Sequence, residues 1–568
     1  MEIDLGAVSD ERQRVEKRTA ELFDLIENFD AVLRTVGSDE VARFELLCEQ
    51  MFSSFVCPDE SVVFPGAAPL SNLDTGDAMP GVYPPFAAAL RDEVGLVDTD
   101  GHHYYGPEAT AELVEAARRF LARTGFLGGE PLSGLEVLPS AGTVHGYDAL
   151  CKVLVRNQAD TVIVPELGYG FFLTQPHRVG GRVVDVPCDG RGRVTASSLR
   201  QVIEEQNRLL WQDWVQDREL LFGRAARKLA AAGIVAHEGE NTRRLAEISD
   251  AMAADPDAWR SAEVGRQLLD LTTGQGEYAL RRVRDALRPP CVVAFLHIQP
   301  TITGHVYSQS EVESLAAVLA AAEVVALEDI AYHSIRCDLR DLPSMQRTNA
   351  LTHTMIGLSK PMAIANFRIG LLYAEKSQSD RIRRALESTT GYISTMLQRA
   401  LTAGLNSEEY DRYTTERSFG ADGYEFRGRL VHQFLTGGQG ELAGAARDLA
   451  MRQARRCPEL APFVDGFLAT GLSSWLRPFN RPDAGFFQVV SCAPMLDSER
   501  FRGLGVRSSF DVFALLAYVF GMRTIPEEGM RPGTRAGTRL RIAFSVEPDV
   551  LAGLFLRVFA GLSVLAEG

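Results

Sequence analysis

Short apolar runs alternate with helical segments over the middle of the chain. Apolar residues recur at helical spacing over 109–124, 144–155 and 311–322. Strands that alternate with helices favour a parallel sheet covered by helices on both faces. The pattern therefore predicts an α/β fold with three layers around a mostly parallel sheet. The apolar runs that predict its strands are 135–138, 161–164, 182–186, 291–296, 324–327 and 353–357.

Two further patterns divide the chain into domains. Residues 1–100 combine a helical pattern with a stretch rich in proline, glycine and serine, so we expect an N-terminal extension that packs on the smaller domain. Residues 101–400 carry the alternating pattern of the large domain. Residues 401–568 contain two strand-like runs, 485–490 and 540–544, that suit a smaller α+β domain.

Residues 204–290 interrupt the alternation. This segment lacks strand signals, predicts several helices and holds three of the four tryptophans, Trp211, Trp214 and Trp259. We interpret it as an inserted helical subdomain with a small core of its own. The alternative is a lid or partner surface over the functional site, because long insertions in compact domains are often functional.

Composition and charge exclude several classes of protein. The formal net charge of -16 disfavours a nucleic-acid partner. Eight cysteines with no CxxC pair indicate reduced thiols rather than a disulfide or zinc framework. The acidic start predicts no signal peptide, and the apolar stretch 315–327 is too short to cross a membrane. We therefore expect a cytoplasmic protein with no membrane partner and no metal site.

Lys360 and its neighbours in sequence carry the strongest chemical signal. Asp329 ends an apolar run 31 residues before Lys360, Tyr332 follows three residues later, and Arg368 lies eight residues beyond the lysine. A lysine can form a Schiff base with an aldehyde, and a carboxylate can pair with a pyridinium nitrogen. A tyrosine can bond a ring oxygen, and an arginine can hold a phosphate. This ordered set is what pyridoxal phosphate requires.

A second signal follows the run 135–138. Ser140-Ala141-Gly142-Thr143 comes after a predicted strand and opens a predicted helix. Backbone N–H groups at such a position converge on an anion.

Taken in order, these segments resemble the class I and II aminotransferases, the fold-type I pyridoxal-phosphate enzymes. The resemblance runs from about Tyr104 to Pro548, and the chain looks like an atypical, long member. It implies that pyridoxal 5'-phosphate is the cofactor and that Lys360, Asp329 and Tyr332 are catalytic. It also implies a homodimer. The cofactor-binding residues implied by the resemblance are Ala141, Gly142, Thr143, Tyr169, Thr301, Asp329, Tyr332, Ser359, Lys360, Arg368 and Tyr105.

The resemblance also assigns individual contacts. Arg541, in the run 540–544, is similar to the family arginine that holds the substrate carboxylate, a task that suits its flat fork. Tyr169 matches the aromatic residue that stacks on the cofactor ring. Either Tyr104 or Tyr105 matches the tyrosine that reaches the phosphate in the neighbouring subunit.

Two positions depart from the family pattern at the cofactor. Thr301 stands where the family has an asparagine that bonds the ring oxygen. Gly357 stands three residues before the lysine, where a phosphate-binding serine or threonine is common. A site altered around the ring oxygen suggests chemistry beyond simple transamination.

Two enzyme functions remain open from the sequence. The first is an aminotransferase-like enzyme that acts on an α-amino acid and a co-substrate through deprotonation at Cα. The alternative is a pyridoxal-phosphate enzyme for elimination, γ-replacement or carbon–carbon bond formation, one that could use S-adenosylmethionine. A transcription regulator with an aminotransferase-like domain is rejected, because residues 1–60 hold 15 acidic against 6 basic residues.

Overall fold

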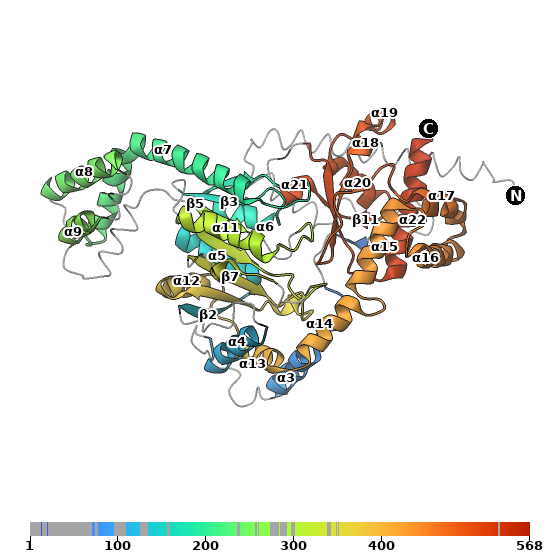
Figure 1. Cartoon of the computed structure of the whole chain (residues 1–568), viewed down its shortest axis with the longest axis horizontal. Coiled ribbons are helices and arrows are strands. Elements are labelled where there is room, and N and C mark those ends of the chain that lie inside the picture. Colours follow the sequence, from blue (N-terminus) through green and yellow to red (C-terminus); the bar gives the residue numbers. More distant parts are fainter. Residues whose placement is uncertain are drawn as a thin grey trace.

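The structure places a seven-stranded and a four-stranded sheet next to each other (Figure 1). A larger sheet is flanked by helices, and a smaller sheet packs among the helices of the C-terminal part of the chain. The computed structural model describes residues 13, 17, 20, 71–73, 78–95, 109–124, 134–155, 160–235, 239–255, 258, 261–272, 283, 292–296, 302–337, 342–347, 349, 351–531, 534 and 536–567.

The larger sheet has seven strands in the order β2-β8-β7-β6-β5-β3-β4. All neighbouring pairs are parallel except those of β8, which runs antiparallel to β2 and β7. The predicted α/β fold with a mostly parallel sheet is confirmed, although β8 was missed. The strands are β2 Leu135–Ser140, β3 Thr161–Pro165, β4 Arg182–Val186, β5 Val292–Leu296, β6 Val325–Asp329, β7 Thr352–Gly357 and β8 Gly370–Glu375.

Successive side chains along each strand enter opposite cores, which gives the three layers. In β3, Ile163 belongs to one core, whereas Val162 and Val164 belong to the other. The first core is closed by α7 and α11, and the second by α5, α6 and α12. Period-two alternation with apolar residues on both sides is the mark of a doubly covered sheet. These helices are α5 Gly142–Leu154, α6 Phe171–Arg178, α7 Ala196–Ala231, α11 Gln309–Ala321 and α12 Lys376–Thr390.

The smaller sheet is antiparallel, with the order β12-β13-β10-β9. Its central pair places Val489 of β10 opposite Arg541 of β13. The predicted strands 485–490 and 540–544 correspond to this pair. The strands are β9 Arg477–Pro478, β10 Phe487–Ser491, β12 Ile525–Pro526 and β13 Arg539–Ala543.

Helices surround the smaller sheet, and one of them is unusually apolar. Helix α22 (Pro548–Ala566) is long and apolar enough to cross a membrane by those two criteria. Its side chains are nevertheless buried against the smaller sheet and neighbouring helices, so it is a core helix. The other helices of this region are α14 Tyr410–Phe419, α15 Tyr424–Thr436, α16 Ala443–Arg456, α17 Val464–Thr470, α18 Ala493–Asp497, α19 Glu499–Gly503, α20 Ser509–Tyr518 and α21 Glu527–Met530.

Part of the N-terminal region contacts both halves of the molecule. Strand β1 (Ser71–Asn72) pairs with β11 (Met522–Arg523), and α3 (Pro84–Gly95) packs on α13 (Thr395–Asn406). Helix α13 also contacts α4 (Ala111–Thr124). The helices expected before residue 57 lie outside the described residues apart from three isolated positions. The division of the chain at residues 100 and 400 stays a prediction.

The inserted segment is helical, and its described residues have their own core. Helix α7 begins before the expected start at residue 204 and runs for 36 residues without a break. Helices α8 (Gly239–Ala254) and α9 (Ala262–Asp270) lie at its outer end, away from the smaller sheet (Figure 1). Trp214, Met252 and Leu268 belong to a cluster that draws on these three helices. Trp259 lies outside the described residues.

Two neighbouring leucines test whether this cluster stabilises the insertion. Leu268 is fully buried, whereas Leu269 is 47% exposed. Leu268→Ala is expected to lower the stability of α8 and α9 by about 2–5 kcal/mol, because it leaves a cavity. Leu269→Ala is the matched control, with a change of about 0.5 kcal/mol or less. Hydrogen exchange of the helix amides measures both, and equal protection in the two variants would contradict an independent core.

Candidate active site

The candidate site lies where the parallel strands of the larger sheet end. Strand β6 ends at Asp329, and its neighbour β7 ends at Gly357, three residues before Lys360. Carboxyl ends of parallel strands meet at one edge of a sheet, so side chains far apart in sequence converge there. A pocket of about 120 Å³ opens at this edge. Its lining residues are Gly142, Thr143, Val144, Tyr169, Phe172, Asp329, Ala331, Tyr332, Gly357, Ser359, Lys360, Arg368 and Arg541.

Asp329 is the buried acid of the pocket. Its Oδ1 accepts a hydrogen bond of 3.0 Å from the Ala331 amide, and its side chain is fully buried. Burial raises the pKa of Asp329 to about 8, although that hydrogen bond lowers it in part. A cation placed beside this carboxyl group would favour its charged form.

The preceding residue, Glu328, has a different environment on the opposite face of β6. Its carboxyl group accepts hydrogen bonds from Ser344 Oγ (2.7 Å), the Met345 amide (2.9 Å) and Thr354 Oγ1 (2.9 Å). These three donors hold Glu328 inside the sheet core, so the strand presents only Asp329 to the pocket.

An anion cradle forms the opposite part of the pocket lining. Helix α5 begins at Gly142, whose φ of 80° suits glycine, and its N-cap residue, Ala141, has no side chain that could cap the first turn. The Arg368 guanidinium lies beside this turn, because its Nη2 donates to the Ala141 carbonyl at 3.3 Å. A Cβ on Gly142 would lie 3.1 Å from that nitrogen. A helix N-terminus beside a guanidinium is a site for phosphate.

Aromatic side chains and a second arginine complete the pocket. Tyr332 packs edge-on against Phe486 and Phe487, with ring centroids 5.5 and 5.2 Å apart. The Arg541 guanidinium lies over the Phe487 ring at 4.3 Å and is only 1% exposed. Burial raises the pKa of the Tyr332 hydroxyl, and the Arg541 charge lowers it in part.

Neighbouring ion pairs distinguish Arg541 from a second arginine on the same strand. Arg539 donates to Glu166 at 2.8 Å and also bonds Glu527. Arg539 is therefore committed to carboxylates of the protein itself, and Arg541 is the arginine of β13 that lines the pocket.

Gly357 is explained by close packing rather than by a lost contact. A Cβ at this position would lie 2.8 Å from Ala331 Cα and 3.3 Å from Thr143 Cγ2. The loop after β6 therefore passes too close to β7 for any larger residue. The serine or threonine common at this position in the family has no room here.

His333 binds the backbone carbonyl of Gly357, and the sequence analysis did not predict this residue. Its Nε2 lies 3.0 Å from the Gly357 oxygen, and its Nδ1 lies 3.0 Å from Ser334 Oγ. Burial lowers the pKa of His333 to about 4, so the neutral ring donates to the carbonyl and accepts from the hydroxyl. It fixes the end of the strand that leads to Lys360.

Most of the residues predicted from the sequence come together in this one pocket. Gly142, Thr143, Tyr169, Asp329, Tyr332, Ser359, Lys360, Arg368 and Arg541 all line it. Ala141 contributes the carbonyl that holds Arg368. Thr301, Tyr104 and Tyr105 lie outside the described residues. The prediction missed four lining or supporting residues: Val144, Phe172, Ala331 and His333. Three of them had a signal, because Val144 follows Thr143 directly, and Ala331 and His333 flank Tyr332.

Comparison with known proteins gives a consistent result. Residues 301–420 match the family described as aminotransferase class I and II, and this segment contains Asp329, Lys360 and Arg368. This segment of the chain is similar to the class I and II aminotransferases. A probable N-acetyl-LL-diaminopimelate aminotransferase of Bacillus subtilis is 27% identical over 133 residues, 23% of this chain. The match spans 34% of that relative.

Solved aminotransferase structures share the fold of this chain over most of its length. The aspartate aminotransferase of Rhizobium meliloti has a TM-score of 0.57 at 16% identity, covering 93% of this chain and 97% of that one. An aminotransferase from Mycobacterium tuberculosis has a TM-score of 0.52 at 15% identity, covering 93% and 96%. The predicted fold-type I architecture is thus confirmed.

The close approach at Gly357 predicts a cost for any side chain there. Gly357→Ala is expected to lower the free energy of unfolding by about 1–3 kcal/mol, because the new methyl group overpacks against Ala331. Gly444→Ala in α16 is the control, since nothing lies within 4 Å of its Cβ position. This variant is expected to gain about 0.4–1 kcal/mol. Denaturant unfolding compares the two, and a neutral Gly357→Ala would contradict the packing argument.

Asp329 makes stability depend on pH when the protein is free of small molecules. Its folded pKa of about 8 lies above the unfolded value, so the folded state retains a proton that the unfolded chain releases. Stability from this group is complete below the unfolded pKa, near 4. It is lost as pH rises towards the folded pKa, by up to about 1.4 kcal/mol per pH unit.

Asp329→Asn removes this dependence. The variant is expected to gain stability relative to the native protein as pH rises from 5 to 8. Denaturant unfolding at several pH values measures the difference. Parallel curves for the two proteins would show that Asp329 does not titrate in this way.

Proposed function

We propose that the chain is a pyridoxal-phosphate-dependent enzyme that acts on an α-amino acid, with aminotransferase-like chemistry. The observation that carries the proposal is the meeting of Asp329, Lys360 and Arg368 in one pocket at the N-terminus of α5. The aminotransferase relatives support the same conclusion.

The described residues fit pyridoxal phosphate by the chemistry of their donors. Arg368 and the first turn of α5 suit its phosphate, and a side chain at Gly142 would crowd that cradle. Asp329 suits its ring nitrogen, because a protonated nitrogen would supply the cation that this buried carboxyl group needs to ionise. Lys360 suits its aldehyde, and Tyr332 suits its ring oxygen.

When bound, pyridoxal phosphate supplies an aldehyde for the substrate amine and a ring that accepts electrons from Cα. Lys360 would hold the cofactor and would move the Cα proton as a general base. Asp329 would favour the protonated form of the ring nitrogen. Tyr169 and Phe172 offer apolar ring surface beside the cofactor.

Arg541 sets the orientation of the substrate. Its guanidinium is buried and rests on Phe487, which leaves a rigid fork to pair with the α-carboxylate. By fixing the carboxylate, Arg541 would favour loss of the Cα proton over loss of CO₂.

The partners follow from this chemistry. We infer an amino-acid substrate, a second co-substrate that takes up the amino group, and a homodimer in the cytoplasm. The dimer rests on the family resemblance of the segment around Tyr105, which would reach the phosphate of the neighbouring subunit.

A lysine substitution tests the proposed function. The protein supplied with pyridoxal phosphate is expected to show a visible absorbance band, and borohydride reduction is expected to leave the cofactor on the peptide that contains Lys360. Lys360→Ala is expected to lose both signals. Lys376→Ala, an exposed lysine at the start of α12, is the control and should keep them.

Substrate turnover gives the second part of the test. Addition of a suitable amino acid is expected to abolish the visible band, and an oxo acid is expected to restore it. A colourless protein that takes up no pyridoxal phosphate would overturn the proposal. If the protein binds the cofactor but no amino acid tried causes this reversible loss of the visible band, the proposed aminotransferase-like chemistry is wrong.

A further inference from the structure

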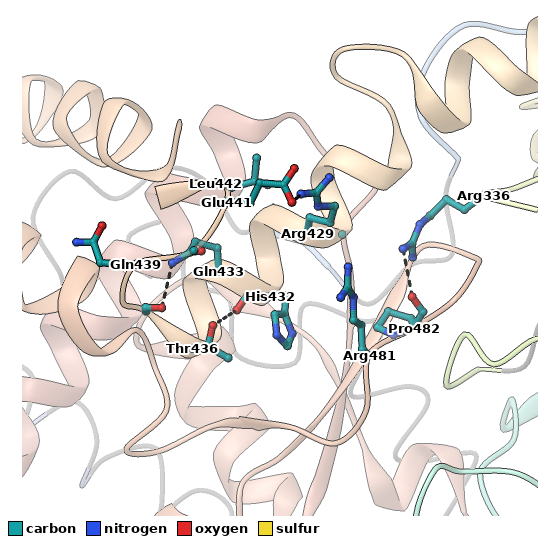
Figure 2. Close-up of a pocket in the computed structure, with 13 residues that line it drawn as sticks. Arg336, Arg429, His432, Gln433, Thr436, Gln439, Glu441, Leu442, Arg481 and Pro482 are labelled. Atoms are coloured by element: carbon teal, nitrogen blue, oxygen red, sulfur yellow. Dashed lines mark hydrogen bonds and ion pairs between the residues drawn. The ribbon is translucent and has the colours of Figure 1, made fainter. Parts of the chain in front are cut away.

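A second cavity, of about 330 Å³, lies beside α15 (Figure 2). Among the described residues, the two pockets share none of their lining. Three arginines line the second cavity, Arg336, Arg429 and Arg481, against one acidic residue, Glu441. This excess of positive charge lies on a chain whose formal net charge is -16.

Arg336 forms one wall and is only 8% exposed. Its Nε donates to Glu425 at 2.7 Å, and its Nη2 donates to the Pro482 carbonyl at 3.1 Å. Its Nη1 is buried and has no hydrogen-bond partner among the described residues. A buried guanidinium nitrogen of this kind requires an acceptor, because an unpaired buried donor is costly.

His432 presents a second buried nitrogen to the same cavity. Its Nδ1 is buried and likewise has no hydrogen-bond partner in the described part of the chain. Burial lowers the pKa of His432, and the nearby Arg481 charge lowers it further. Two polar nitrogens that both need a partner therefore line one space.

The other two arginines approach that space from different elements. Arg429 lies on α15 and pairs with Glu441, whereas Arg481 lies in the segment that precedes β10. In Figure 2 the Arg481 side chain extends towards Arg429, and the His432 ring lies beside it. Cationic donors on separate elements suit an anion with several oxygens better than they suit a single flat carboxylate.

We propose that this cavity binds the phosphate group of a small phosphorylated molecule. The phosphate oxygens accept from Arg336, Arg429 and Arg481, and His432 lies within the same group of donors. Gly428 keeps the Arg336 end open, because a Cβ there would lie 3.0 Å from the Phe544 ring and 3.4 Å from Arg336 Nη1. Thr436 and Gln439 line the rest of the cavity, where the remainder of the molecule fits.

Calorimetric titration with inorganic phosphate tests the proposal. The cradle at α5 also suits phosphate, so the titration uses the native protein and Arg368→Gln. Binding that persists in Arg368→Gln belongs to the second cavity. In that background, Arg429→Gln and Arg481→Gln are each expected to weaken binding about tenfold or more, because each removes a charge-assisted hydrogen bond. Arg412→Gln on α14 is the control, since this arginine is 76% exposed.

A gain in affinity separates the proposal from simple misfolding. Glu441→Gln is expected to tighten phosphate binding, because it removes the carboxylate that competes for Arg429. Three outcomes would overturn the proposal. They are loss of all phosphate binding in Arg368→Gln, unchanged binding in both the Arg429 and Arg481 variants, and tighter binding of succinate than of phosphate at these residues.

Discussion

The parallel register of β6 and β7 is the constraint on which the candidate site depends. Asp329 lies opposite Met355, and the Ile330 amide donates to the Met355 carbonyl at 3.0 Å. This pairing sets the end of β6 two residues before the end of β7, so the turn that carries Lys360 opens beside Asp329. A shift of one residue would turn Asp329 into the sheet core and bring Glu328 to the pocket. The three hydrogen bonds to Glu328 oppose such a shift.

A group of ion pairs joins this edge of the larger sheet to the smaller one. Glu166 follows β3, and it binds Arg539 of β13 at 2.8 Å and Arg531 at 3.2 Å. Arg531 also binds Asp185 of β4 at 2.5 Å. Burial alone would raise the pKa of Glu166, but the hydrogen bonds from Arg539 and the Cys188 amide lower it overall. The two sheets are therefore held together close to Arg541, which the smaller sheet contributes to the pocket.

Local sequence patterns predicted most of the strands and the polar residues of the site. They could not predict contacts between segments that are distant in the sequence. The run 182–186 matches β4 residue for residue, because three valines in a five-residue run give a clear strand signal even at the edge of the sheet. Strand β8 was missed although residues 370–374 form a buried apolar run like those of the other strands. Its antiparallel position between β2 and β7, by contrast, is set by sheet order, which apolar patterning does not encode. Gly357 looked like a lost phosphate ligand, because its contact with Ala331 exists only in the folded chain. The arginines around His432 lie on different elements and had no shared motif.

The unbroken length of α7 has a practical consequence. A helix of 36 residues spans about 54 Å at 1.5 Å per residue, and α8 and α9 lie at its far end (Figure 1). That end is a suitable point for attaching a fluorophore, a surface anchor or a fused protein, because the attachment would stand clear of both sheets. The chain thus carries its own rigid spacer between the larger sheet and whatever is joined to that end of α7.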